Sequence, residues 1–189
     1  MIFRRLGLIN IRDIIWIMAL ALLWTVASSI TNRLFGFQSA YIFSILTLSF
    51  FLTFAVNISP KQGTGLLFLI LGGLFTYTLN DIGSAGINRL ILLLATGVVF
   101  EIIFFLLSIE YKKNIRMNTI IAATISAGLI PVIMGLLYSL EIVSRMIVPV
   151  INLMLLSLVT AFAGSLISFL FWYRIKATKL YIRMVYMNE

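Results

Sequence analysis

Six long apolar runs occupy most of the chain and constrain its fold more than any other feature. A helix that crosses a bilayer needs about 20 predominantly apolar residues, and runs near this length lie at about 13–30, 40–57, 64–79, 88–109, 118–140 and 147–173. Only short loops separate them. We therefore predict an all-α fold, a single domain over residues 1–189 built as a bundle of six transmembrane helices, with a basic tail at 174–189.

The composition restricts the chemistry that such a bundle can perform. The chain has 62% hydrophobic and 11% charged residues and contains neither Cys nor His, which excludes thiol or imidazole catalysis and Cys/His zinc sites. It also lacks the common phosphate-binding and hydrolase motifs, and no pair of acids lies at the helical spacing that would hold a metal. We therefore expect no enzyme activity, no catalytic residue, no metal and no cofactor.

The 14 Lys and Arg residues are distributed unequally between the two sides of the predicted bundle. Six spans leave Arg33, Arg89 and Arg145 on one side and the other eleven on the opposite side, namely Arg4, Arg5, Arg12, Lys61, Lys112, Lys113, Arg116, Arg174, Lys176, Lys179 and Arg183. By the positive-inside rule, the side with eleven is cytoplasmic and carries both termini. Topology thus explains the net charge of +8, and we expect no nucleic-acid binding.

Both ends of the chain carry basic clusters. Arg4 and Arg5 precede the first run, as in a secretory signal, but this run is longer than the ~7–15 apolar residues of a signal peptide and five more spans follow. We expect an uncleaved first helix. The basic residues from Arg174 to Arg183 anchor the last span in the cytoplasm, and the alternative is that they bind anionic membrane lipid or a cytoplasmic partner.

Glu101 is an acid inside the apolar fourth run, in the segment Gly97-Val98-Val99-Phe100-Glu101. A carboxylate in hydrocarbon costs about 2.5–3.5 kcal/mol on insertion scales, and such residues usually face a cavity or a partner. At ~1.5 Å per residue, Glu101 lies about 18 Å below Arg89, near the bilayer centre. We predict that it binds a small ligand with a cationic or amine-bearing ring. The alternative is a structural hydrogen bond to a neighbouring helix.

Other polar and aromatic residues lie nearer the predicted outer surface. The candidate ligand contacts among them are Asn80, Asp81, Asn88, Tyr138, Glu141, Arg145 and Asn152. The candidates to cover or stack on a ring are Phe35, Phe37, Tyr77 and Tyr138. Each of these residues has an alternative interpretation as a solvated loop or interfacial residue.

Rows of small residues four apart indicate close contacts between helix backbones. Two rows lie in the sixth span, Ser157/Ala161/Ser165 and Thr160/Gly164/Ser168, and one lies in the first, Ala21/Thr25/Ser29. Each row serves either packing within the bundle or the docking of a protein partner. Pro131 and Pro149 interrupt or start the last two spans, which is typical of kinked helices that leave a cavity.

Four segments resemble the substrate-binding S components of energy-coupling factor (ECF) vitamin transporters. They are Arg12-Asp13-Ile14-Ile15-Trp16-Ile17 at the first span, Lys61-Gln62-Gly63-Thr64-Gly65-Leu66-Leu67 at the third, Gly97-Val98-Val99-Phe100-Glu101 in the fourth, and Ala163-Gly164-Ser165 before the basic tail. The similarity extends over nearly the whole length in size, span number and orientation. It is strongest to the branch associated with thiamine or its hydroxymethylpyrimidine precursor.

The resemblance implies a six-helix protein of the plasma membrane that captures a vitamin-like molecule from outside. Such a protein passes the molecule inward by toppling in the bilayer while it is docked to a coupling transmembrane subunit and two ATPases. Family members use small residues of the first helix for docking, and here the corresponding row is Ala21, Thr25 and Ser29. This chain has no ATP-binding motif of its own, so the ATPases are separate subunits.

Two other classes of membrane protein remain as alternatives. One is a gradient-driven carrier or channel that uses Glu101 as a proton or cation site, although neither a second intramembrane acid nor an inverted repeat is evident. The other is an assembly or scaffold protein without a ligand.

Overall fold

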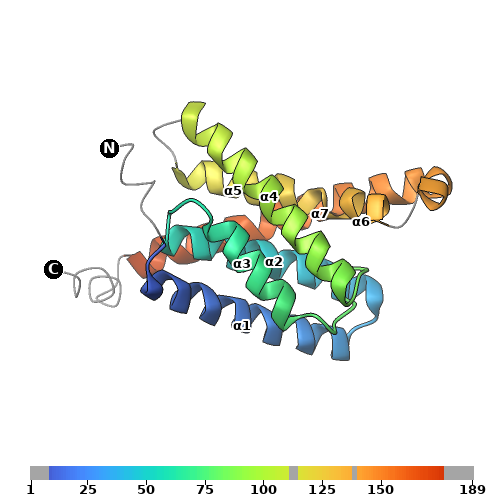
Figure 1. Cartoon of the computed structure of the whole chain (residues 1–189), viewed down its shortest axis with the longest axis horizontal. Helices are drawn as coiled ribbons and strands as arrows, with labels where there is room; N and C mark the ends of the chain where they lie inside the picture. Colours follow the sequence, from blue (N-terminus) through green and yellow to red (C-terminus); the bar gives the residue numbers. More distant parts are fainter. Residues whose placement is uncertain (1–8, 111–114, 138–139, 177–189) are drawn as a thin grey trace.

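The computed structural model describes residues 9–110, 115–137 and 140–176, and all regular structure within these ranges is helical. The helices are α1 (Ile11–Leu34), α2 (Phe37–Ile58), α3 (Thr64–Phe75), α4 (Ile87–Glu110), α5 (Ile115–Gly128), α6 (Ile130–Leu137) and α7 (Leu140–Lys176). Figure 1 shows them packed side by side as a bundle. The all-α prediction is confirmed for the described part of the chain.

Five helical segments in the described ranges are long and apolar enough to cross a membrane, the pattern of a multi-pass membrane protein. They are Ile11–Leu34, Phe37–Ile58, Ile87–Ser108, Arg116–Leu137 and Val150–Lys176. The fourth of them contains α5 and α6. The predicted third span, 64–79, corresponds to α3, which ends at Phe75 and has 12 residues. At ~1.5 Å per residue it is about 18 Å long, less than the ~30 Å thickness of the hydrocarbon core.

Proline affects the last two predicted spans differently. Pro131 is the second residue of α6, and α5 ends three residues before it at Gly128, so the predicted interruption is present. Pro149, in contrast, lies inside α7. The residues between the two predicted spans, 141–146, are also helical, because α7 already begins at Leu140. A proline is tolerated inside a membrane helix where neighbouring groups satisfy the freed carbonyl.

The helices contact one another in a closed ring, with α5 and α6 counted as one segment. Around the ring, α1 packs on α2, α2 on α7, α7 on α5, α5 on α4, α4 on α3, and α3 on α1. Within it, α2 also contacts α3 and α5, and its apolar window is 56% buried against 28% for that of α1. The second helix thus lies closest to the core, and α1 and α7 present broad apolar faces outward.

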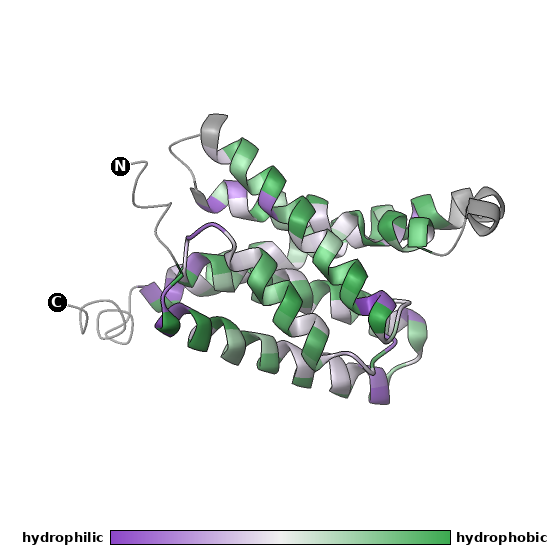
Figure 2. Ribbon diagram, in the orientation of Figure 1, coloured by the Kyte–Doolittle hydropathy of each residue, from purple (hydrophilic) through white to green (hydrophobic). Residues whose placement is uncertain are grey.

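Polar residues gather at the two ends of the bundle, while the middle is hydrophobic (Figure 2). The start of α1 and the end of α7 lie at the same end (Figure 1). We call this the terminal end, and the opposite end, where α3 is joined to α4, the loop end. The connection that covers the loop end runs from Thr76 to Gly86.

The contact between α2 and α7 is close because glycine allows it. A Cβ on Gly164 would collide with the carbonyl oxygen of Leu46 and the hydroxyl of Ser49. About two helical turns further toward the loop end on α7, Tyr41 Oη and Ser157 Oγ share a hydrogen bond of 2.6 Å. The row Ser157/Ala161/Ser165 is fully buried, as the packing interpretation of the small residues predicts.

Candidate functional site

Glu101 contacts the first turn of α3. Its Oε1 accepts hydrogen bonds from the backbone N–H groups of Gly65, at 3.0 Å, and Leu66, at 3.2 Å. These N–H groups have no partner within α3 because they belong to its first turn, and the helix dipole favours a negative charge there. Glu101 is partly exposed. The alternative interpretation of this acid, a structural hydrogen bond to a neighbouring helix, predicts this contact. Its predicted contact with a ligand stays a prediction.

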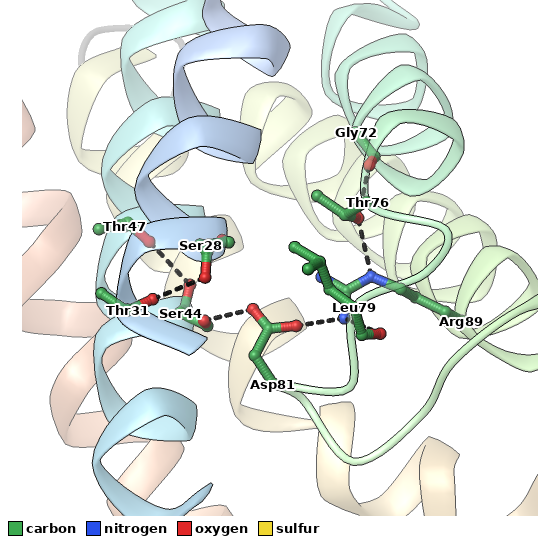
Figure 3. A network of polar contacts seen from close by, with 9 residues as sticks. All are labelled: Ser28, Thr31, Ser44, Thr47, Gly72, Thr76, Leu79, Asp81 and Arg89. Atoms are coloured by element: carbon green, nitrogen blue, oxygen red, sulfur yellow. Dashed lines mark hydrogen bonds and ion pairs between the residues drawn. The ribbon is translucent and has the colours of Figure 1, made fainter. Parts of the chain in front are cut away.

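A charged cluster with no exposed side chain occupies the loop end. Asp81, on the α3–α4 connection, and Arg89, in the first turns of α4, form an ion pair and are both 0% exposed. The other carboxylate oxygen of Asp81 accepts a hydrogen bond from Ser44 of α2. Figure 3 shows the carboxylate between these two partners. The pair thus joins α2, the connection and α4.

The guanidinium of Arg89 has further partners on α3 and α1. Its Nε donates to Thr76 Oγ1 at 2.7 Å, and its Nη1 donates to the carbonyl of Leu79 at 3.2 Å (Figure 3). Its central carbon lies 5.8 Å from the ring centroid of Trp24 on α1, within the range of a cation–π interaction. Trp24 in turn packs against Gly72, where a Cβ would lie 2.5 Å from the indole Cζ3.

A third polar contact joins α1 and the α2–α3 connection at the terminal end. Lys61 Nζ lies 2.6 Å from Asp13 Oδ2, and the backbone N–H of Asn10 donates to the same oxygen at 2.9 Å. The carboxylate of Asp13 therefore balances both the charge of Lys61 and the partial positive charge at the N-terminus of α1. Both side chains are about one-fifth exposed, so this ion pair contributes little to stability, ~0–1 kcal/mol.

The structure gathers only part of the predicted ligand-binding set. Asp81 lies in the buried cluster, while Asn80, Asn88 and Asn152 are exposed. Tyr138 lies outside the described residues. Glu141 and Arg145 lie in α7, but their side chains also lie outside what the structure describes.

The aromatic residues predicted to cover a ligand lie on the surface of the loop end. Phe35 stacks on Phe43 with their ring centroids 5.2 Å apart, and Phe37 and Tyr77 are each about half exposed. These rings are exposed, whereas the cluster around Arg89 is buried. We find no three acidic side chains gathered into a metal-binding group in the part of the chain that the structure describes.

The predicted docking row on α1 is divided between interior and surface. Ala21 is fully buried and accepts a hydrogen bond through its carbonyl from Thr25 Oγ1, at 2.8 Å. Thr25 and Ser29 are partly exposed. The latter two are therefore accessible from the surface, while Ala21 serves packing inside this chain.

Sequence reasoning missed Arg89 and Trp24 as site residues. It treated Arg89 as a charge of an outer loop and did not single out Trp24 of the first span. One available signal is the position of Arg89, two residues after the start of the helix at Ile87. The acid Asp81 lies eight positions earlier, and a glycine-containing segment separates the two residues. A charge just inside a span needs a partner, and Asp81 is the acid nearest to it in sequence.

These features define an α-helical, multi-pass membrane protein with a buried charged cluster at one end of a ring of helices. No family model matches the chain, and no curated protein or solved structure is significantly similar to it. The functional argument therefore rests on the sequence and on the geometry of the site.

Proposed function

We propose that this chain is the substrate-capture subunit of an ECF-type importer in the plasma membrane. It binds a small vitamin or vitamin-precursor molecule from the outer side and works with a coupling transmembrane subunit and two ATPase subunits. The proposal includes six membrane segments, the short α3 among them, with both termini in the cytoplasm.

Support for the topology comes from the ring of helices and from the charges. The five long apolar segments and α3 form one closed ring, and the ends of α1 and α7 that lead to the termini lie together. Lys61, Arg174 and Lys176 belong to the side with eleven basic residues. The loop end is then the outer end, and α3 reaches partway across the bilayer.

The observation that carries the proposal is the buried cluster around Asp81 and Arg89. Charged residues inside membrane bundles are costly and usually mark substrate or ion pathways. Here the charges lie under a connection between two helices, at the end assigned to the outside, where a captured molecule would enter. A capture subunit needs a polar recognition site of this kind and no catalytic machinery.

Binding and uptake experiments separate this proposal from its main alternative. The purified chain in detergent should bind a vitamin-like molecule by itself, measured by calorimetry with thiamine, its hydroxymethylpyrimidine precursor and uncharged carbonyl-bearing vitamins as probes. Proteoliposomes that contain only this chain should accumulate none of these probes, with ATP inside or with a proton or sodium gradient. Uptake should appear when the coupling subunit and ATPases are added with ATP.

Two controls complete this test. Proteoliposomes with all subunits and a non-hydrolysable ATP analogue should show binding but no accumulation. Purification of the tagged chain from native membranes should recover ABC-type ATPases, identified by mass spectrometry. Accumulation by the isolated chain in response to an ion gradient would instead make the protein a carrier and refute the capture proposal.

A further inference from the structure

The buried cluster at the loop end contains more hydrogen-bond donors than acceptors. Arg89 Nη2 and Trp24 Nε1 are buried and have no hydrogen-bond partner. Both are N–H groups in planar side chains, so they only donate, and they lack the freedom of a hydroxyl to rotate toward another acceptor. Buried donors of this kind are nearly always paired in proteins, and each exception requires an explanation.

Two hydroxyl groups from the same region share this property. Ser28 lies one turn after Trp24 on the buried side of α1, and Ser84 belongs to the connection that carries Asp81. Neither Ser28 Oγ nor Ser84 Oγ has a hydrogen-bond partner. Figure 3 shows Ser28, Asp81 and Arg89 in one polar region. The four unpaired groups thus come from α1, α4 and the connection between α3 and α4.

The charges of the cluster are already balanced. Asp81 and Arg89 neutralise each other, with both side chains fully buried. An additional buried charge would have no counter-charge, and such a charge is strongly unfavourable in a low-dielectric site. The molecule that suits these donors is therefore one that offers hydrogen-bond acceptors without a net charge.

We infer that Arg89 Nη2 and Trp24 Nε1 donate to the carboxamide or ring carbonyl oxygen of a small uncharged molecule, and that the hydroxyls of Ser28 and Ser84 bind its remaining polar groups. This inference deepens the proposed function and rests on it for the assignment of the loop end to the outside. It differs from the expectation of an amine-bearing ligand, because that expectation was based on Glu101, whose Oε1 binds α3.

The connection between α3 and α4 contributes one of the four unpaired groups, Ser84 Oγ. This segment covers the cluster with Ile82 and Ser84, which are 0% and 1% exposed. Gly83 and Gly86 give it positive φ angles of 82° and 65°, which other residues rarely adopt. The connection therefore joins the cluster through Asp81 while it provides one of the donors through Ser84.

Matched probes test the chemistry of the site. Nicotinamide, nicotinate and 3-(aminomethyl)pyridine share one ring and differ only in bearing an uncharged amide, a carboxylate or an amine. Benzamide, benzoate and benzylamine repeat the comparison on a second ring. Binding to the purified full-length chain is measured by calorimetry and by the fluorescence of Trp24 in a W16F/W172F variant, in which Trp24 is the remaining one of three tryptophans.

We expect the amides to bind and the carboxylates and amines to bind at least tenfold more weakly. W24F keeps an aromatic ring but removes the N–H donor, and S28A removes a hydroxyl, so each should weaken amide binding by roughly 3- to 10-fold, the effect of one hydrogen bond. S165A is the control, because Ser165 also has a buried, unpaired hydroxyl but lies on α7, outside the cluster. It should bind the amides as the parent does.

Three results would overturn the inference. The first is binding of a carboxylate or amine as tight as that of the amide. The second is no amide binding at concentrations up to about 10 mM, a range that covers the weak affinities of small fragments. The third is equal amide affinity in W24F, S28A and S165A. The proposed capture function is judged separately, by uptake. Gradient-driven accumulation by the chain alone would refute capture and leave the donor site intact.

Discussion

Arg89 and Glu101 lie twelve residues apart on α4 and bind opposite ends of α3, which itself has 12 residues. Glu101 accepts hydrogen bonds at the N-terminus of α3, and Arg89 donates to Thr76 at its C-terminus. The stretch of α4 between Arg89 and Glu101 thus matches the length of α3, which runs antiparallel to it, about 18 Å at ~1.5 Å per residue. The negative side chain lies at the positive end of the helix dipole and the positive side chain near the negative end.

This arrangement predicts a stability role for Glu101. Glu101→Gln keeps one acceptor oxygen and loses the charge, so we expect the free energy of unfolding to fall by about 0.5–1.5 kcal/mol, and by more in Glu101→Ala. Thermal unfolding in detergent measures both variants. Membrane insertion and binding of the amide probes should be unchanged. A variant with parental stability and weakened ligand binding would instead make Glu101 a ligand contact.

The ion pair of Asp81 and Arg89 predicts a larger effect. Removing one member leaves a buried charge without a partner, so Asp81→Asn or Arg89→Gln alone should lower the free energy of unfolding by about 3–5 kcal/mol. The double variant should lose less than the sum of the two single variants, because neither charge is then isolated. A double-mutant cycle by denaturant unfolding measures this coupling. Strict additivity would show that the two side chains do not interact.

Gly83 predicts that the connection between α3 and α4 tolerates little change. Its φ is +82°, and a Cβ there would lie 2.5 Å from Met134 Sδ of α6. We expect Gly83→Ala to destabilise the fold by roughly 1–3 kcal/mol through strain and steric conflict. Gly36→Ala is the matched control, since a Cβ at Gly36 has no atom within 4 Å. Similar unfolding temperatures for the two variants would contradict this prediction.

The absence of cysteine allows a direct test of orientation. Single cysteines at the exposed positions Ala85 and Gln62 lie at the loop end and the terminal end. In intact cells, a membrane-impermeant maleimide should label the variant at position 85, while position 62 should react only after permeabilisation. A reporter after Glu189 should be cytoplasmic. The opposite labelling pattern would reverse the topology, and a C-terminus found outside would refute the six-span count.

The apolar segments can be predicted from the sequence because each is a long, continuous run of apolar residues. Helix ends are less predictable. The third run continues to residue 79, but the helix ends at Phe75, where Thr76 Oγ1 bonds to the carbonyl of Gly72 and accepts from Arg89. This ending depends on a residue of another helix, and such a contact is not encoded in local hydrophobicity.

The site shows the same division between local and long-range information. Glu101 is recognisable as unusual, because an acid in an apolar helix is costly. The partners of Glu101 cannot be recognised in the same way, because they are backbone N–H groups, which every residue except proline has. Asp81 is a candidate ligand contact from the sequence, and that role stays a prediction; its pairing with Arg89 and Ser44 brings together three elements and only appears in three dimensions.

The packing of α7 on α2 determines when this protein can complete its fold during synthesis. About 100 residues separate the end of α2 at Ile58 from the middle of α7, so at ribosomal rates of ~5–20 residues per second α2 waits for its partner on the order of ten seconds. During that time the hydroxyl of Tyr41 lacks Ser157, and the backbone around Leu46 lacks Gly164. A chain that stops before α7 leaves its most buried helix facing lipid, and it becomes a natural target for membrane quality control.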